Sequence, residues 1–324
     1  MGESDFLWFY SELYCHWLKI KIFAKFVLER MIMNSEVQRK SREDHPEITK
    51  KFIDIERVFS AKNPRLARSI PGFVFRYLKK IIHQDEINDF MFRSKDRWGL
   101  DYAQAILEDW QVSTEVVRPL KLDPYGRYLI ASNHPLGGID GIALLHEAGK
   151  VKKDVVFPVN DLLLNLPNLY ELFIPVNKHG SNAENIRLFN ETFASDVLIL
   201  YFPAGLVSRK RSGIIRDVEW KKTFLTKAKA YKRDIVPVFI AGRNTNFFYN
   251  LANFRKRLRI KTNIEMLFLP DEMYKYKNKL IRITFGKPIP VSIFDKRRTD
   301  QQWAILLRDH VYKLHNNPDQ EFVY

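Results

Sequence analysis

The sequence predicts an α/β fold with a mixed, mostly parallel sheet flanked by helices and an N-terminal helical extension. From about residue 125, short apolar runs rich in β-branched and aromatic residues alternate with stretches of helical character. This alternation is typical of a sheet whose two faces are covered by helices. Residues 51–118, in contrast, look mostly helical, with breaks at Asn63-Pro64 and Ile70-Pro71-Gly72. The chain has 324 residues, of which 46% are hydrophobic, enough for one large core.

Residues 1–33 form the first predicted element, an aromatic and basic amphipathic helix. Aromatic residues such as Trp8 alternate there with lysines such as Lys19, which suits a helix lying in a membrane interface. A helix packed on the rest of the protein fits the same pattern equally well. Met31 and Met33 leave open that this segment is an upstream extension from a misassigned start codon, so we assign no function to it.

Two further regions follow along the chain. Residues 34–118 form a helical region that opens with a polar linker over 34–50, and residues 119–324 form the α/β domain. Within that domain the runs that predict strands are 127–132, 155–159, 172–176, 197–202, 235–241 and 281–285. The stretches that predict helices are 140–148, 183–193, 219–231 and 247–258. Pro237 lies inside one strand, which favours an edge or a bulge there.

The charge of the chain favours polyanionic partners. The formal net charge is +15 at pH 7, which suits nucleic acid, anionic lipid, phosphorylated substrates or acidic carrier proteins. The alternative is that many lysines simply solvate helix surfaces. The single cysteine, Cys15, excludes an intramolecular disulfide framework and fits a reducing compartment. No group of His and Cys residues has the spacing of a metal site, so we expect no structural zinc and no cofactor.

The sequence also argues against insertion into a membrane. No uncharged run reaches the roughly 18 residues that a spanning helix needs. The acidic Glu3 and Asp5 at the start are unlike the basic segment of a secretory signal.

The stretch with the strongest signal for catalysis runs from Ser132 to Gly141, between a predicted strand and a predicted helix. His134 and Asp140 are six positions apart and do not share a helix face, but Gly137 and Gly138 allow the chain to turn between them. An aspartate that bonds to one ring nitrogen would leave the other free to take a proton from a nucleophile. In the simpler alternative, the stretch is an ordinary turn and Asp140 only caps the helix.

Three later stretches carry weaker signals. In the stretch from Leu200 to Arg211, an apolar strand ends in Pro203-Ala204-Gly205, and a cluster of cations follows. A glycine-containing loop beside arginines is typical of an anion site. An ordinary strand exit with a solvated basic loop fits equally. Residues 174–180 form a strand end with a cation and a second histidine, and 235–242 form a strand with an internal proline.

In this order and spacing, the four stretches resemble the motif series of the glycerolipid (lysophospholipid) acyltransferase superfamily over roughly residues 115–290. The resemblance implies that His134 is the general base and Asp140 its orienting partner. It implies that Asn177 and Lys178 lie near the polar head group of the acceptor. The other substrate-binding residues that we infer are Asn133, Gly137, Gly138, Phe202, Pro203, Ala204, Gly205, Ser208 and Arg209.

Two features depart from the main family pattern. Five residues separate His134 from Asp140, where the main family has four; this looks like the bacterial subgroup called hemolysin-like, which is associated with acylated amino-acid lipids. Ala204 stands where the family has Glu, and Val207 where it often has Arg. Both differences remove charge that would contact a glycerol phosphate. A lyso-ornithine or lyso-glycine type of lipid, whose 3-hydroxy group is esterified, therefore competes with lysophosphatidic acid as acceptor.

The resemblance implies a bacterial, membrane-associated O-acyltransferase of lipid or phospholipid biosynthesis. Its acyl donor would be a thioester of coenzyme A or acyl carrier protein, and its acceptor a lyso-lipid, either a lyso-amino-acid lipid or a lysophospholipid. We expect a peripheral location on the anionic cytoplasmic face of the inner membrane. No metal or prosthetic group is implied.

Two alternatives stay open. The basic and aromatic residues around 247–261 could bind nucleic acid, but no helix-turn-helix, zinc-finger or RNA-recognition signature accompanies them, so we expect no nucleic-acid partner. A hydrolase or thioesterase could use the same dyad, although the chain has no Gly-x-Ser-x-Gly elbow.

Overall fold

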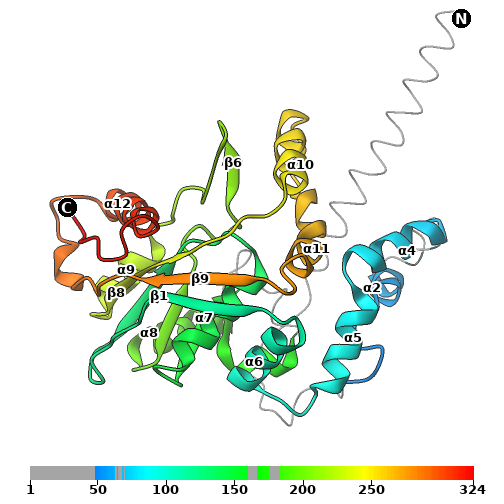
Figure 1. The fold of residues 1–324 in the computed structure, drawn as a ribbon, viewed down its shortest axis with the longest axis horizontal. Coiled ribbons are helices and arrows are strands. Elements are labelled where there is room, and N and C mark those ends of the chain that lie inside the picture. The colour runs from blue at the N-terminus through cyan, green and yellow to red at the C-terminus, as the bar shows by residue number, and fades with distance from the viewer. Residues whose placement is uncertain (1–47, 63, 65–67, 69, 160–165, 176–182) are drawn as a thin grey trace, which may run out of the picture.

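A computed structural model describes residues 48–62, 64, 68, 70–159, 166–175 and 183–324. Its centre is a seven-stranded sheet in the order β1-β9-β8-β2-β5-β3-β4 (Figure 1). The predicted fold class, a mostly parallel α/β sheet flanked by helices, is confirmed. The segment 1–33 and residues Asn177 and Lys178 lie outside the described residues.

The strands that we predicted all occur in the sheet. In chain order the sheet strands are β1 (Ser113–Arg118), β2 (Tyr128–Ser132), β3 (Val155–Val159), β4 (Phe173–Pro175), β5 (Leu198–Tyr201), β8 (Asp234–Ile240) and β9 (Leu280–Phe285). Every pairing in the sheet is parallel except that of β8 with β9. The carboxyl ends of β8, β2, β5, β3 and β4 therefore meet at one edge of the sheet, where α/β proteins place their ligands.

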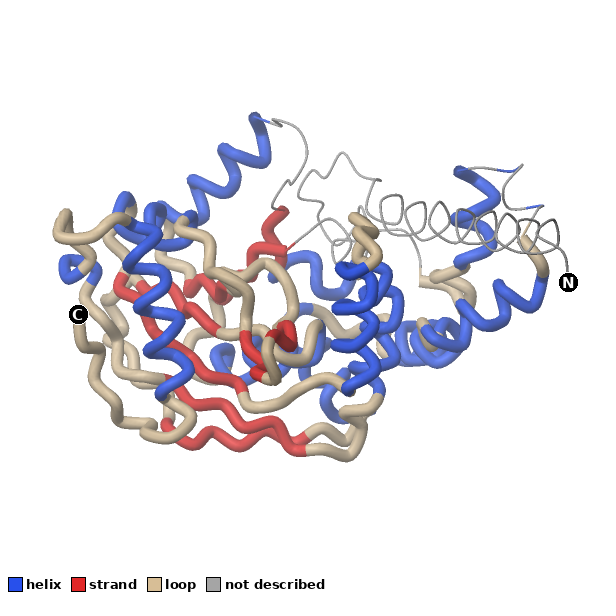
Figure 2. Tube along the Cα trace, turned by 90° about the horizontal axis from the view of Figure 1, so that it is seen from above, coloured by secondary structure: helices blue, strands red, loops and turns tan. Residues whose placement is uncertain are grey.

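Helices cover both faces of the sheet. One face packs against α6 (Gly99–Asp109) and α7 (Gly138–Gly149), and the other against α8 (Ala183–Ala194), α9 (Thr223–Ala230) and α12 (Asp300–Lys313). Figure 2 shows the strands in red with helices lying across them. Strand β2 illustrates the arrangement, because Ile130 packs toward α7 while Leu129 and Ala131 pack into the opposite cluster. A strand buried on both faces needs such a continuous apolar run.

The helical region before the sheet consists of α2 (Ile55–Lys62), α4 (Gly72–Ile81), α5 (Gln84–Arg93) and α6. The first three lie beside the sheet domain (Figure 1). Residues 113–118, which we placed at the end of this region, instead form β1. This edge strand alternates between exposed and half-buried positions, and its two valines make too short an apolar signal to reveal it.

Most of the remaining elements lie at or near the carboxyl edge of the sheet. They are the hairpin of β6 (Arg209–Arg211) and β7 (Ile214–Arg216), the helices α10 (Asn246–Arg257) and α11 (Leu269–Tyr274), and the 3-10 turn η4 (Ile264–Phe268). The 3-10 turn η3 (Pro167–Leu172) leads into β4, and η5 (Val291–Ile293) lies at the opposite edge, where the Val291 N–H donates to Asp234 at the start of β8. Helix α10 and the hairpin project on the same side of the sheet (Figure 1) and are joined by a hydrogen bond from Asn253 Nδ2 to the Lys210 carbonyl, 3.2 Å.

Pro237 does not mark an edge, because β8 pairs with β2 on one side and β9 on the other. The pairing with β9 begins only at Val238, and Gly286 packs so closely beside Pro237 that a Cβ on it would lie 2.7 Å from the proline Cγ. The missing N–H of the proline thus falls where the β8–β9 ladder is already interrupted.

Among the described helices, none combines the length and the apolar character that a membrane crossing requires.

Candidate active site

The carboxyl end of β2 brings His134 and Asp140 together, as the spacing predicted. The ring Nδ1 of His134 lies 3.0 Å from Asp140 Oδ2. His134 stands on the loop after the strand, and Asp140 in the first turn of α7. Gly137, between them, has φ of +89°, a backbone conformation that glycine adopts without strain.

Asp140 is fully buried and accepts hydrogen bonds at both oxygens. The N–H of Leu136 donates to Oδ2 at 2.8 Å, and the N–H of Gly141 donates to Oδ1 at 2.9 Å. The positive end of the α7 dipole also favours a carboxylate in this turn. With the carboxylate acting as acceptor, Nδ1 of His134 is the donor, so Nε2 is the nitrogen that can take a proton.

The Nε2 atom of His134 is available for that role. It has no hydrogen-bond partner in the described part of the chain, and 17% of the side chain is exposed. The ring stacks on Phe202, with centroids 4.0 Å apart and planes 19° apart. Phe157 meets Phe202 edge-on at 4.9 Å. The His134 ring is therefore fixed on one edge by the Asp140 carboxylate and on one face by the ring of Phe202.

Gly137 and Gly138 provide the close packing of this turn. A Cβ on Gly137 would lie 2.7 Å from a methyl carbon of Leu269, and one on Gly138 would lie 2.6 Å from the terminal methyl of Met273. The glycines thus let α11 approach the loop that carries His134. Their contact with substrate stays a prediction.

The loop after β5 carries Phe202, Pro203, Ala204 and Gly205, which we predicted to bind substrate. Its turn is closed by a hydrogen bond from the Gly205 N–H to the Phe202 carbonyl, 3.0 Å, and Gly205 has φ of +61°. Ala204 is 2% exposed and belongs to the core cluster that contains Trp220. Pro203 is buried too, and its carbonyl accepts from the Lys221 N–H. Of these four residues, Phe202 alone has a recorded contact with His134.

Ser208 is buried and supports His134 from behind. Its N–H donates to the His134 carbonyl at 2.7 Å, and its hydroxyl donates to Asp217 Oδ1 at 2.6 Å. Asp217 in turn accepts from the His134 N–H at 3.2 Å and from the indole N–H of Trp220 at 2.9 Å. Burial raises the pKa of the Asp217 carboxyl, against the opposing effect of these donors.

Arg209 is also buried, in an ion network. Its guanidinium lies 3.1 Å from Glu265, whose other oxygen accepts from Arg255 at 2.8 Å. Arg209 also donates to the Val207 carbonyl and lies over the ring of Phe248. Burial lowers the pKa of the Arg209 guanidinium despite the nearby carboxylate. In this structure its partners are protein groups, and its contact with the acceptor stays a prediction.

Asn133 links two strands. Its side chain donates to the carbonyl of Ile240 at 2.9 Å and accepts from the N–H of the same residue at 2.7 Å. The amide is 2% exposed. The observed contacts of Asn133 therefore join the ends of β2 and β8, while its role toward substrate stays a prediction.

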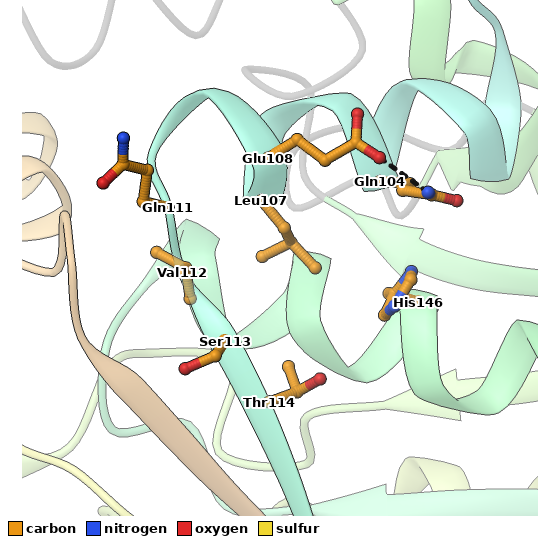
Figure 3. Close-up of a pocket in the computed structure, with 8 residues that line it drawn as sticks. All are labelled: Gln104, Leu107, Glu108, Gln111, Val112, Ser113, Thr114 and His146. Carbon is orange, nitrogen blue, oxygen red and sulfur yellow. Dashed lines mark hydrogen bonds between the residues drawn. The ribbon is translucent and has the colours of Figure 1, made fainter.

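A separate hollow of about 400 Å³ lies at the opposite end of α7, where His146 faces residues of α6 and β1 (Figure 3). Burial and the nearby Lys150 lower the pKa of His146. The Glu108 carboxylate at its rim is held by Arg97 and Gln104. The nearest acid contact of His146 is loose, with 3.8 Å between its Nε2 and Glu147 Oε1, against 3.0 Å between His134 and Asp140. His146 is therefore the weaker candidate for a base. Within the described chain there is no group of three or more His, Cys, Asp or Glu residues that could hold a metal ion.

Sequence reasoning missed the buried polar residues that support the site. Asp217, Tyr312 and Glu265 come from segments that were not singled out. The N–H of Asp217 donates to the Tyr312 hydroxyl at 2.7 Å, so α12 supports the base loop from a distance of 178 positions along the sequence, counted from His134 to Tyr312.

Comparison with known proteins supplies the family. A sequence model of an acyltransferase family matches residues 57–321. A protein of Bacteroides thetaiotaomicron named lyso-glycine lipid O-acyltransferase is 49% identical over 269 residues, covering 81% of this chain and 97% of that protein. A protein of the same name from Phocaeicola vulgatus is 48% identical over 265 residues, covering 81% and 95%.

Among solved structures, the 1-acyl-sn-glycerophosphate (LPA) acyltransferase PlsC from Thermotoga maritima aligns with a TM-score of 0.43 and 14% identity, covering 75% of this chain and 93% of that one. The family match spans most of the chain, and it includes the His134–Asp140 pair together with every sheet strand. The chain is therefore an acyltransferase and belongs to this family.

Proposed function

We propose that this acyltransferase esterifies the hydroxyl group of a lyso-amino-acid lipid, of the lyso-glycine type, with the acyl group of a thioester. The two relatives near half identity carry that acceptor in their names. The observation that carries the proposed chemistry is the buried Asp140 held against His134 Nδ1 at 3.0 Å, with Nε2 left free.

The reaction needs one proton transfer in each direction. His134 Nε2 takes the proton of the acceptor hydroxyl as its oxygen attacks the thioester carbonyl carbon. The new C–O bond pushes an electron pair onto the carbonyl oxygen. When the tetrahedral intermediate collapses, the C–S bond breaks and the thiolate takes the proton from Nε2. Asp140 stabilises the imidazolium between these steps.

Backbone N–H groups of the glycine turn are suited to the negative oxygen of that intermediate. The N–H of Leu136 is already bonded to Asp140, so we assign the role to Gly137 and Gly138. Both stand at the start of α7, where N–H groups have no acceptor within the helix.

The surroundings favour an acceptor without a phosphate. Ala204 is packed in the core and brings no charge to the loop. Arg209, which we expected in the acyl-acceptor site, is 4% exposed and paired with Glu265. A lysophospholipid would need a strong cationic site on this loop, whereas an amino-acid lipid does not.

We further propose that the enzyme works at the cytoplasmic face of the inner membrane and takes its acyl group from acyl carrier protein or coenzyme A. Helix α10 supports the membrane contact, because Phe247 and Phe254 are more than half exposed on it and its last turn carries the exposed Lys256 and Arg257. Apolar rings beside cations suit an anionic lipid surface.

The test is transfer by the purified full chain, supplied with acyl carrier protein thioester or acyl-coenzyme A and with a 3-hydroxyacyl glycine lipid. We expect the ester of that lipid by mass spectrometry, with little ester formed from lysophosphatidic acid. Release of free fatty acid with no ester would show a thioesterase instead. Co-sedimentation with anionic vesicles, and not with neutral ones, checks the membrane contact.

A further inference from the structure

Strands β5 and β8 pair with β2 on either side, and the loops that follow them hold their arginines in different environments. After β5, Arg209 is buried against Glu265. After β8, the loop of Gly242, Arg243 and Asn244 leads into α10, and Arg243 is exposed with no carboxylate partner in the described part of the chain. Its guanidinium is held at 3.0 Å by Oδ1 of Asn246. Arg243 is therefore a cation at the catalytic edge that protein carboxylates leave available.

Three contacts place this loop beside the catalytic pair. Asn133, next to His134, bonds to both backbone groups of Ile240, at the end of β8. Gly242 packs against Leu136 so closely that a Cβ would lie 2.7 Å from the leucine methyl. The N–H of that same Leu136 donates to Asp140. Leu136 thus lies between Gly242, on the loop after β8, and the Asp140 carboxylate.

The loop also holds polar groups without partners. The Asn244 side chain is 2% exposed, and neither its amide nitrogen nor its amide oxygen has a hydrogen-bond partner among the residues that the structure describes. A buried amide left in this state is destabilising, because it has lost its water and gained no partner. Asn244 directly precedes Thr245, the N-cap of α10, where the first N–H groups have no acceptor within the helix. These groups suit a small anion.

One acidic side chain is already present nearby. Glu272 accepts from the N–H and the hydroxyl of Thr245, both at 2.6 Å. Its charge is balanced by Lys275 at 2.8 Å. The contacts left for a ligand are therefore those of Arg243, Asn244 and the N–H groups of Asn246 and Phe247.

We infer that Arg243 and Asn244 bind the carboxylate of the acceptor's head group while His134 acts on its hydroxyl. This inference rests on the proposed function. In a 3-hydroxyacyl glycine, hydroxyl and carboxylate are joined by the equivalent of about two extended residues, roughly 7 Å. Two ends so close must be held by neighbouring loops, and an arginine binds a carboxylate with two parallel hydrogen bonds.

The experiment compares two acceptors, the 3-hydroxyacyl glycine and its glycinamide, in which a neutral amide replaces the carboxylate. We expect wild type to prefer the acid by roughly 10–100-fold in kcat/KM, the range for hydrogen bonds to a charged group. Arg243→Gln should abolish the preference by raising KM for the acid much more than KM for the glycinamide. Arg243→Lys should keep part of it.

Arg211→Gln is the matched control, because it removes an exposed arginine from the nearby hairpin and should leave the preference intact. If Arg243→Gln prefers the acid as strongly as wild type does, or if wild type does not distinguish the two acceptors, the inference is wrong. If wild type acylates neither acceptor, the proposed function itself fails. Thermal unfolding of each variant verifies that it is folded.

Discussion

The loops after β2 and β5 lie side by side at the same edge of the sheet, yet they present their polar groups in opposite ways. The first loop, residues 133–141, leaves His134 Nε2 open beside a buried carboxylate. The second loop, residues 202–209, buries Ser208 and Arg209 to 1% and 4% exposure. The comparison supports our proposal that the first loop carries the chemistry and that the second holds it in place.

The link between the loops is short and polar. Ser208 and Asp217 bond to the backbone of His134 on both its N–H and its carbonyl. Arg209 joins the same segment to η4 and α10 through Glu265 and Arg255. A change in the second loop should therefore act on stability or on the position of His134, whereas a change in the first should act on the reaction itself.

The largest expected effect lies in the first loop. In Asp140→Asn, the amide favours the wrong histidine tautomer, and kcat should fall by roughly 10³–10⁴-fold, as in other His–Asp pairs. The measurement is the steady-state rate of ester formation. Glu147→Gln, at the other end of α7 and bonded to Lys150, is the matched control and should stay within about twofold of wild type. Equal activity in Asp140→Asn and wild type would end the proposed role of Asp140.

The second prediction concerns the ion network of the second loop. Glu265→Gln leaves Arg209 and Arg255 buried without a counter-charge, so the free energy of unfolding should fall by about 3–5 kcal/mol. Denaturant unfolding measures this loss. KM for the acceptor, measured on the folded protein, should hardly change. A stable variant with a greatly raised KM would instead place Arg209 at the acceptor and break the contrast between the loops.

The smallest effect is expected at the link between the loops. In Asp217→Asn, the amide can still accept from Ser208 but leaves the Trp220 indole N–H without an acceptor, so His134 is less firmly held. We expect kcat to fall about tenfold, or about 1.4 kcal/mol of barrier, with KM unchanged. The control is Asp309→Asn, in an exposed ion pair with Arg216, which should leave kcat intact. If kcat is also unchanged in Asp217→Asn, then Asp217 does not position His134.

The same residue gives a pH dependence of stability. Burial raises the pKa of Asp217 above 3.8, so the folded state binds this proton more tightly than the unfolded chain does. The free energy of unfolding contributed by Asp217 is therefore greatest below pH 3.8 and declines as the pH rises through the folded-state pKa. The Asn side chain of Asp217→Asn cannot ionise, so this variant should lack the decline. Denaturant unfolding of wild type and variant, measured from below pH 3.8 upward, should show the difference.

The parts of the fold that could be predicted are those with a local signal. The strand β2 is a continuous apolar run, and Gly137 and Gly138 predict the turn that brings Asp140 back to His134. The edge strand β1 alternates only weakly. Pro237 favoured an edge or a bulge; β8 is not an edge strand, and the proline is accommodated by an interruption of the β8–β9 ladder. Helix α12 was not anticipated either, although it begins with a capping box formed by Thr299 and Gln302.

The site follows the same division. His134 and Asp140 are six residues apart, so their meeting could be argued from one short stretch. The roles of Arg209 and Ser208 depend on Glu265 and Asp217, which come from other elements. No pattern within a single segment reveals whether a cation faces a substrate or a buried carboxylate, because burial is set by the packing of distant segments.

The central claim is that His134 takes the proton of the acceptor hydroxyl. Its most direct test is the single-turnover rate of ester formation by His134→Ala with thioester and 3-hydroxyacyl glycine both saturating, beside His146→Ala as the control on the same chain. We predict a loss of roughly 10³-fold or more for His134→Ala and a rate close to wild type for His146→Ala. Full transfer by His134→Ala would contradict the account.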